Sequence, residues 1–179
     1  MKKNAGTIGF FLDNLKDLYV DQFTQERYGA RYRFTLAHEI GHYVLHKSFI
    51  EAVSPHRINE WKTQYHNIES SQYRWIEWQA NAFAGLALVP RQMLIKQVLE
   101  MKPDLNSKIN EINRNPLKPT KDDLLDFLIE YIAKKLENIF NVSRDVIRIR
   151  LEKELQAGLY TDCNTKEESD MFFNNILND

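Results

Sequence analysis

The stretch that most restricts the fold of this chain is FTLAHEIGHYVLH, residues 34–46. His38 and His42 are four residues apart, so on an α-helix their side chains lie one above the other on the same face. Both imidazoles can then reach a single ion. The pattern therefore predicts a helix over residues 31–47 and a second element, packed against it, that completes a metal site.

Glu39 completes the HExxH pattern of zinc hydrolases. It lies one residue round the helix from His38, beside the ion rather than on it. From there its carboxylate can take a proton from zinc-bound water, whose pKa the metal lowers to about 7, so it is the predicted catalytic base. Gly41 costs a helix about 1 kcal/mol relative to alanine, and its presence predicts that another element packs closely here.

His46 is the nearest further histidine, but helix geometry excludes it as the third ligand. A catalytic zinc ion takes three protein ligands and keeps one position open. His46 is eight residues from His38, which corresponds to about 12 Å along a helix axis, so one ion cannot bind both. We expect His46 to support the site from outside, through a hydrogen bond or at the negative end of the helix dipole.

Glu77 is the favoured third ligand, and it lies in a second predicted helix over residues 75–88. Asn81 is one turn further on the same face, where its amide can accept the other ring N–H of a ligand histidine. The predicted packing side of this helix, which would approach Gly41, consists of Ala80, Phe83, Ala84 and Leu88. The weaker alternatives, which lack such a partner, are Glu51, His56, Glu60, His66 and Glu69. Three candidates stay open for a donor to the oxyanion: Tyr65, His66 and Tyr73.

The expected fold class is α+β. Residues 7–12 and 17–21 favour strands, and the Asp13-Asn14 pair between them predicts the turn of a hairpin. We expect this small hairpin or sheet to pack on the HExxH helix and on the second ligand helix, ahead of an all-helical C-terminal unit. Further helices are expected over residues 91–101, 120–140 and 144–158, the second of them begun by a capping box of Thr120 and Asp123.

Two sequence blocks together resemble the ImmA/IrrE family of zinc metallopeptidases. The first is FTLAHEIGH, residues 34–42, which continues to His46, and the second is Glu77-x-x-Ala80-Asn81-x-Phe83-Ala84, which ends in Leu88-Val89-Pro90. The resemblance implies a gluzincin-type site with one Zn²⁺ per chain. In that site the ligands would be His38, His42 and Glu77, and Glu39 would be the general base.

The resemblance also implies a biological role. Such peptidases cleave or inactivate a helix-turn-helix transcriptional repressor and so derepress genes, on mobile elements or in stress responses. Here 34 residues separate His42 from Glu77, and this long connection leaves the substrate groove undefined. The expected domains are residues 1–102 as the metallopeptidase core, 103–119 as a linker with at most one turn of helix, 120–160 as a helix-turn-helix-like unit, and 161–179 as a tail helix.

Composition excludes several other classes of function. The net charge is −1 and the pI is about 6.5, so no global charge favours nucleic acid or anionic lipid. No run approaches the roughly 20 apolar residues of a membrane span or forms a signal peptide. Cys163 is the only cysteine, which excludes a disulfide framework and a thiolate zinc cluster. We therefore expect a cytoplasmic protein without a membrane partner.

The C-terminal helices suggest a rival function. The short turn 141–143 between two predicted helices has the outline of a helix-turn-helix, and Arg144 and Arg148 share one face of the second helix. However, residues 121–158 contain seven Lys/Arg and eight Asp/Glu, whereas DNA binding requires a positive surplus on the docking face. The alternative hypothesis is a non-catalytic regulator that binds a repressor or, as the weaker reading, DNA through these helices.

Overall fold

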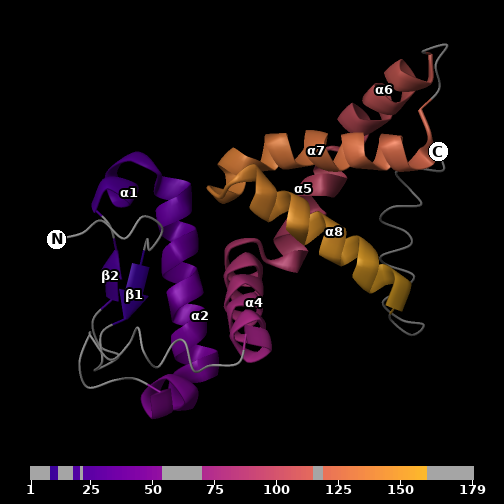
Figure 1. Ribbon diagram of the computed structural model, residues 1–179. Coiled ribbons are helices and arrows are strands. Elements are labelled where there is room, and N and C mark those ends of the chain that lie inside the picture. Colours follow the sequence, from indigo (N-terminus) through magenta and orange to yellow (C-terminus); the bar gives the residue numbers. More distant parts are fainter. Residues whose placement is uncertain (1–8, 12–17, 21, 54–69, 115–118, 161–179) are drawn as a thin grey trace. The chain divides into compact units, whose positions relative to one another are not determined.

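The structure is a computed structural model that describes residues 9–11, 18–20, 22–53, 70–114 and 119–160 (Figure 1). The chain forms two compact units, Met1–Leu88 and Val89–Asp179. Within the described ranges, no helix combines the length and the apolar character that a membrane crossing requires.

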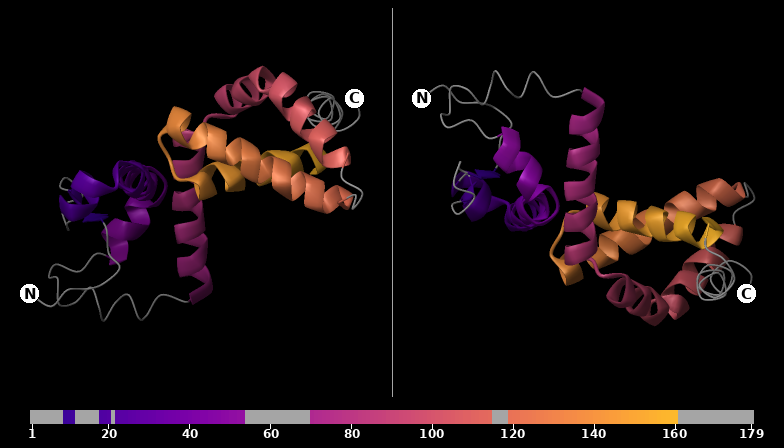
Figure 2. Two further views of the ribbon diagram at one scale, coloured as in Figure 1. Left: turned by 90° about the horizontal axis from the view of Figure 1, so that it is seen from above. Right: turned by 90° about the horizontal axis from the view of Figure 1, so that it is seen from below.

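The first unit contains the two helices that carry the HExxH motif and Glu77. In chain order its elements are β1 (Gly9–Phe11), β2 (Leu18–Val20), α1 (Gln22–Arg27), α2 (Gly29–Val53) and α4 (Ser70–Leu88). The helices predicted over residues 31–47 and 75–88 are both confirmed, and both are longer than expected. Figure 2 shows α2 and α4 side by side.

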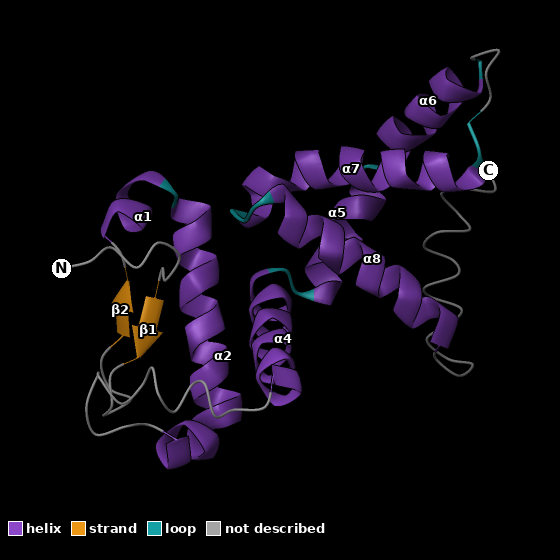
Figure 3. Ribbon diagram, in the orientation of Figure 1, coloured by secondary structure: helices purple, strands orange, loops and turns teal. Residues whose placement is uncertain are grey.

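The expected α+β fold class is wrong, because the described part of the chain is overwhelmingly helical (Figure 3). Its strands, β1 and β2, have three residues each and pair only with one another, antiparallel, with Phe10 opposite Tyr19. A ribbon this short cannot form a layer that covers a core. The β-favouring runs predict a sheet, but the first unit is stabilised mainly by packing between its helices.

Close packing between α2 and α4 centres on Gly41. A Cβ atom at this position would lie 3.0 Å from Cδ1 and 3.2 Å from Cβ of Phe83 on α4. Ala37 on α2 and Ala80 on α4 are buried as well, with exposed fractions of 8% and 0%. Small side chains therefore bring the two helix backbones near one another, as the glycine predicted. Ile40, by contrast, has 42% of its surface exposed and does not belong to this contact.

The second unit is entirely helical in its described part. Its elements are α5 (Arg91–Glu100), α6 (Lys102–Asn113), α7 (Lys121–Phe140) and α8 (Arg144–Tyr160). The predicted capping box is confirmed, because Thr120 Oγ1 accepts from the Asp123 amide and the Asp123 carboxylate accepts from the Thr120 amide, each at 3.2 Å. The core includes Leu94, Val98, Leu105, Ile132, Leu136, Ile147 and Leu151, all buried.

The expected linker contains more helix than its composition predicted, because α6 occupies Lys102–Asn113. Pro103 lies in the first turn of α6, where its missing amide hydrogen costs no helical hydrogen bond. Along the chain, the boundary between the two compact units falls between Leu88 and Val89. The functional division at residues 102, 119 and 160 stays a prediction, and the tail helix of residues 161–179 lies outside the described residues.

We predict that Gly41→Ala destabilises the protein. Overpacking costs about 1–3 kcal/mol, whereas the gain in helix propensity is about 1 kcal/mol. Rotation of the Phe83 ring would not relieve the contact between the new alanine Cβ and the Cβ of Phe83, because the Phe83 Cβ moves only with the α4 backbone. Urea unfolding followed by circular dichroism measures the change. Gly29→Ala is the matched control, because no atom lies within 4 Å of its added Cβ; equal stability of the two variants would contradict the close packing.

Candidate metal centre

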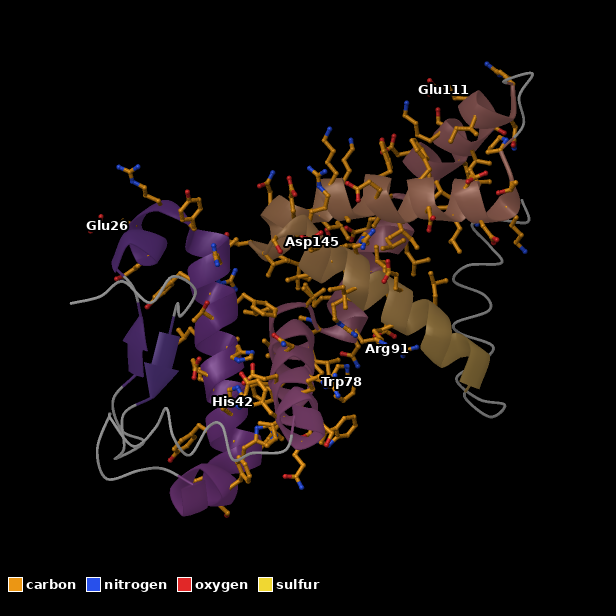
Figure 4. All side chains as sticks on the ribbon, viewed as in Figure 1. Glu26, His42, Trp78, Arg91, Glu111 and Asp145 are labelled. Atoms are coloured by element: carbon orange, nitrogen blue, oxygen red, sulfur yellow. The ribbon has the colours of Figure 1, made fainter. Side chains whose placement is uncertain are left out.

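The candidate site lies between α2 and α4. The uninterrupted helix of α2 puts His38, Glu39 and His42 on adjacent positions of one surface, and α4 supplies Glu77. Figure 4 shows His42 projecting from α2 toward α4. The 34 intervening residues therefore do not separate the motif from its predicted third ligand.

Three potential ligand groups converge at this place. His38 Nε2 and His42 Nε2 are 3.0 Å apart, and each lies 3.4 Å from a carboxylate oxygen of Glu77. In the part of the chain that the structure describes, this is the one group of three or more histidine, cysteine or acidic side chains that could hold a metal ion. The side chains are 15%, 12% and 31% exposed in the order His38, His42, Glu77, so the site is open to solvent mainly through the carboxylate.

The donors fit a small tetrahedral cation. Nitrogen and oxygen ligands at about 2.0–2.1 Å from a tetrahedral zinc ion are separated from one another by roughly 3.3 Å, close to the observed 3.0 and 3.4 Å. Two Nε2 atoms 3.0 Å apart cannot both carry a hydrogen. A cation would instead satisfy both lone pairs and the carboxylate charge.

Asn81 orients one of the two histidines. Its Oδ1 lies 3.1 Å from His38 Nδ1, and because an amide oxygen only accepts, the imidazole donates through Nδ1. A neutral His38 then keeps the lone pair of Nε2 directed at the cluster. This arrangement is the usual support for a metal-binding histidine.

His46 lies next to the other histidine. Its Nδ1 is 3.2 Å from His42 Nδ1, and its Nε2 is 2.9 Å from Oε1 of Gln79 on α4. Since α2 continues to Val53, His46 does not stand at a helix end. Sequence reasoning missed Gln79, because residues two apart lie about 200° apart around a helix, and this spacing predicts no shared face for Gln79 and Glu77. The two side chains in fact lie on either side of the buried Ala80.

Charge and burial act together on the ionisation of the ligands. Burial raises the pKa of Glu77, but the adjacent His38–His42 pair, which donates to the carboxylate and attracts its charge when it carries an extra proton, outweighs burial and holds that pKa far below its usual range. Burial lowers the pKa of His38, but the hydrogen bond and the charge of Glu77 outweigh it, so this pKa is raised above 6.5. Glu77 is thus an anionic ligand at any pH near neutrality.

Glu39 has the opposite shift. Burial raises its pKa above the ordinary 4.5, and the nearby His38 and His42 only partly offset that rise. A carboxylate with a raised pKa is a stronger base than a solvated one, as proton transfer near neutral pH requires. The geometry therefore combines a metal-ligand set with an adjacent carboxylate of increased basicity.

Most of the remaining candidates from the sequence have side chains that the structure does not describe. Tyr73 lies on α4, four residues before Glu77. Glu51 falls in the last turn of α2, where side chains are not described. The other candidates, Tyr65, His56, Glu60, His66 and Glu69, lie outside the described residues.

We predict that Glu77→Ala abolishes stoichiometric metal binding, because it removes the only acidic ligand and leaves two imidazoles. Metal content after dialysis, measured by atomic emission, tests this. Glu39→Gln is the control and should retain the metal, since Glu39 lies beside the ligand set. Full metal retention in Glu77→Ala would exclude Glu77 as the third ligand.

We also predict that metal affinity falls as the pH drops through the raised pKa of His38. Below that pKa a proton occupies the imidazole and competes with the metal, which weakens affinity about tenfold for each pH unit. Glu77 stays ionised over this range and adds no loss. Chelator competition at a series of pH values measures the effect. An affinity that begins to fall only below pH 6.5, the ordinary value for histidine, would contradict the prediction.

Comparison with known proteins agrees with this geometry. No curated protein and no solved structure matches the chain. The model of the peptidase M78 family, described as the IrrE N-terminal-like domain, matches residues 29–152. This match covers α2, α4 and the whole candidate site. The chain is therefore a member of the IrrE N-terminal-like peptidase family, which the two sequence blocks had indicated.

Proposed function

We propose that this protein is a zinc-dependent endopeptidase that hydrolyses a peptide bond. The observation that carries the proposal is the convergence of His38, His42 and Glu77 on one point, with ligand separations of 3.0–3.4 Å. Membership of a peptidase family supports the same reading. Oxygen and nitrogen ligands without cysteine suit zinc, and one ion per chain accounts for the whole ligand set.

The residues divide the chemistry between them. A zinc ion held by His38, His42 and Glu77 would lower the pKa of water and polarise the peptide carbonyl. Glu39 accepts the proton of the attacking water and then delivers it to the leaving amine. Burial, which raises the pKa of Glu39, suits it to both steps, since the same carboxyl must hold a proton and then release it.

The proposed substrate is a helix-turn-helix transcriptional repressor, whose cleavage would derepress genes of a mobile element or a stress response. This part of the proposal rests on the family resemblance and not on a contact within the structure. A repressor acts in the cytoplasm, so the proposal places the enzyme there as well.

One observation weighs against the rival function of DNA binding through α7 and α8. Arg144 is paired with Glu130 at 2.8 Å and with Glu137 at 3.4 Å, and Arg148 is 3.7 Å from Glu152. An arginine engaged by carboxylates of its own unit must give up those pairs before it contacts a phosphate or a base. We therefore regard residues 120–160 as a structural or protein-binding unit.

We predict that Glu39→Gln abolishes cleavage while zinc remains bound. Glutamine keeps the size of the side chain but cannot accept a proton. The loss should reach at least 10²-fold, the lower end of what general-base catalysis contributes. The assay incubates the purified zinc-loaded protein with the repressor encoded beside its gene and follows fragments by mass spectrometry.

Two controls separate catalysis from binding. Glu26→Gln, an exposed change on α1, should cleave as wild type does, which shows that loss of one carboxylate has no general effect. A reporter controlled by the repressor then tests the rival function. If Glu39→Gln relieves repression as fully as wild type, the protein acts by binding and the proposed peptidase mechanism is wrong.

A further inference from the structure

A series of hydrogen bonds through the buried His46 leads from Gln79 to His42 of the candidate metal site. His46 is 8% exposed and uses both ring nitrogens, toward His42 and toward Gln79. Burial alone requires a polar side chain to find partners. It does not require that one of those partners be the far nitrogen of a metal-ligand histidine.

The donor and acceptor in each of these hydrogen bonds follow from the side chain of Gln79. The oxygen of Gln79 can only accept, so His46 Nε2 donates to it at 2.9 Å. A neutral His46 then has its lone pair on Nδ1, which accepts from His42 Nδ1 at 3.2 Å. His42 is thereby left with the lone pair on Nε2, the atom 3.0 Å from His38 Nε2 and 3.4 Å from Glu77.

We propose that His46 and Gln79 are positioning residues that hold ligand His42 in the Nδ1–H tautomer, with Gln79 acting through His46. Asn81 does the same for His38 in a single step. The two imidazoles therefore have different supports: an exposed amide for His38, and for His42 the buried His46 backed by the half-buried Gln79. The proposal rests on the metal-binding part of the proposed function and is independent of peptide cleavage.

The measurement is the zinc dissociation constant by chelator competition on the full chain. Loss of such a supporting hydrogen bond costs about 10- to 100-fold in metal affinity, so Gln79→Leu and His46→Ala should each weaken zinc binding by that factor. Gln79→Glu keeps an acceptor at the same place and should restore much of the affinity. Gln72→Leu, an exposed change on the same helix α4, is the matched control and should have no effect.

A double variant tests whether Gln79 acts through His46 or whether the two residues affect zinc binding independently. Because Gln79 acts only through His46, His46→Ala/Gln79→Leu should bind zinc no more weakly than His46→Ala alone. Independent contributions would multiply instead. Multiplied losses, or wild-type affinity in Gln79→Leu, would overturn the proposal.

The tautomer of His42 provides a readout that does not need the metal or the substrate. In ¹⁵N NMR spectra of metal-free wild type, His42 should be in the Nδ1–H form, and Gln79→Leu should shift it toward the Nε2–H form. An unchanged tautomer would overturn the proposal. If wild type binds no zinc, the proposed function fails, yet this spectrum still decides the role of Gln79. If zinc binds but nothing is cleaved, only the peptidase assignment fails.

Discussion

The contact between Gly41 and Phe83 is the constraint on which the site depends. A Cβ at Gly41 would lie 3.0–3.2 Å from Phe83, so only glycine lets α4 lie this close to α2. Glu77 can then reach 3.4 Å from both histidines. Because the candidate metal ligands come from two helices joined by a long connection, their relative positions depend on the packing of α2 against α4 and not on the residues between the helices.

Electrostatics at the site follows from that packing. The pKa of Glu77 is lowered because the adjacent histidine pair stabilises its charge, whereas the pKa of Glu39, one residue beyond His38, is raised because burial dominates. Two glutamates in the same cluster thus have opposite shifts, and this difference matches a division between ligand and base. Asn81 and the His46–Gln79 pair add a further layer of contacts, to the far ring nitrogens of the two imidazoles.

Sequence reasoning predicted features that depend on local spacing, but it did not predict the fold class, which depends on how the elements pack. The capping box at Thr120 and the helices that hold the ligands depend on spacing within one turn, and they were predicted correctly. The α+β class was wrong, because β-favouring residues produced strands of only three residues. Prolines and asparagines suggested a linker where α6 forms, since Pro103 in a first turn is compatible with a helix.

The HExxH pattern was enough to predict two imidazoles and a carboxylate together on one helix, because residues four apart on a helix share a face. The sequence also indicated Glu77 as a candidate ligand, and it indicated the family that the family model shows. The long side chains that meet across helices, namely Gln79 with His46 and Arg144 with Glu130 and Glu137, could not be predicted without the packed fold. Such contacts depend on the separation and rotation of packed helices, which periodicity along one segment does not contain.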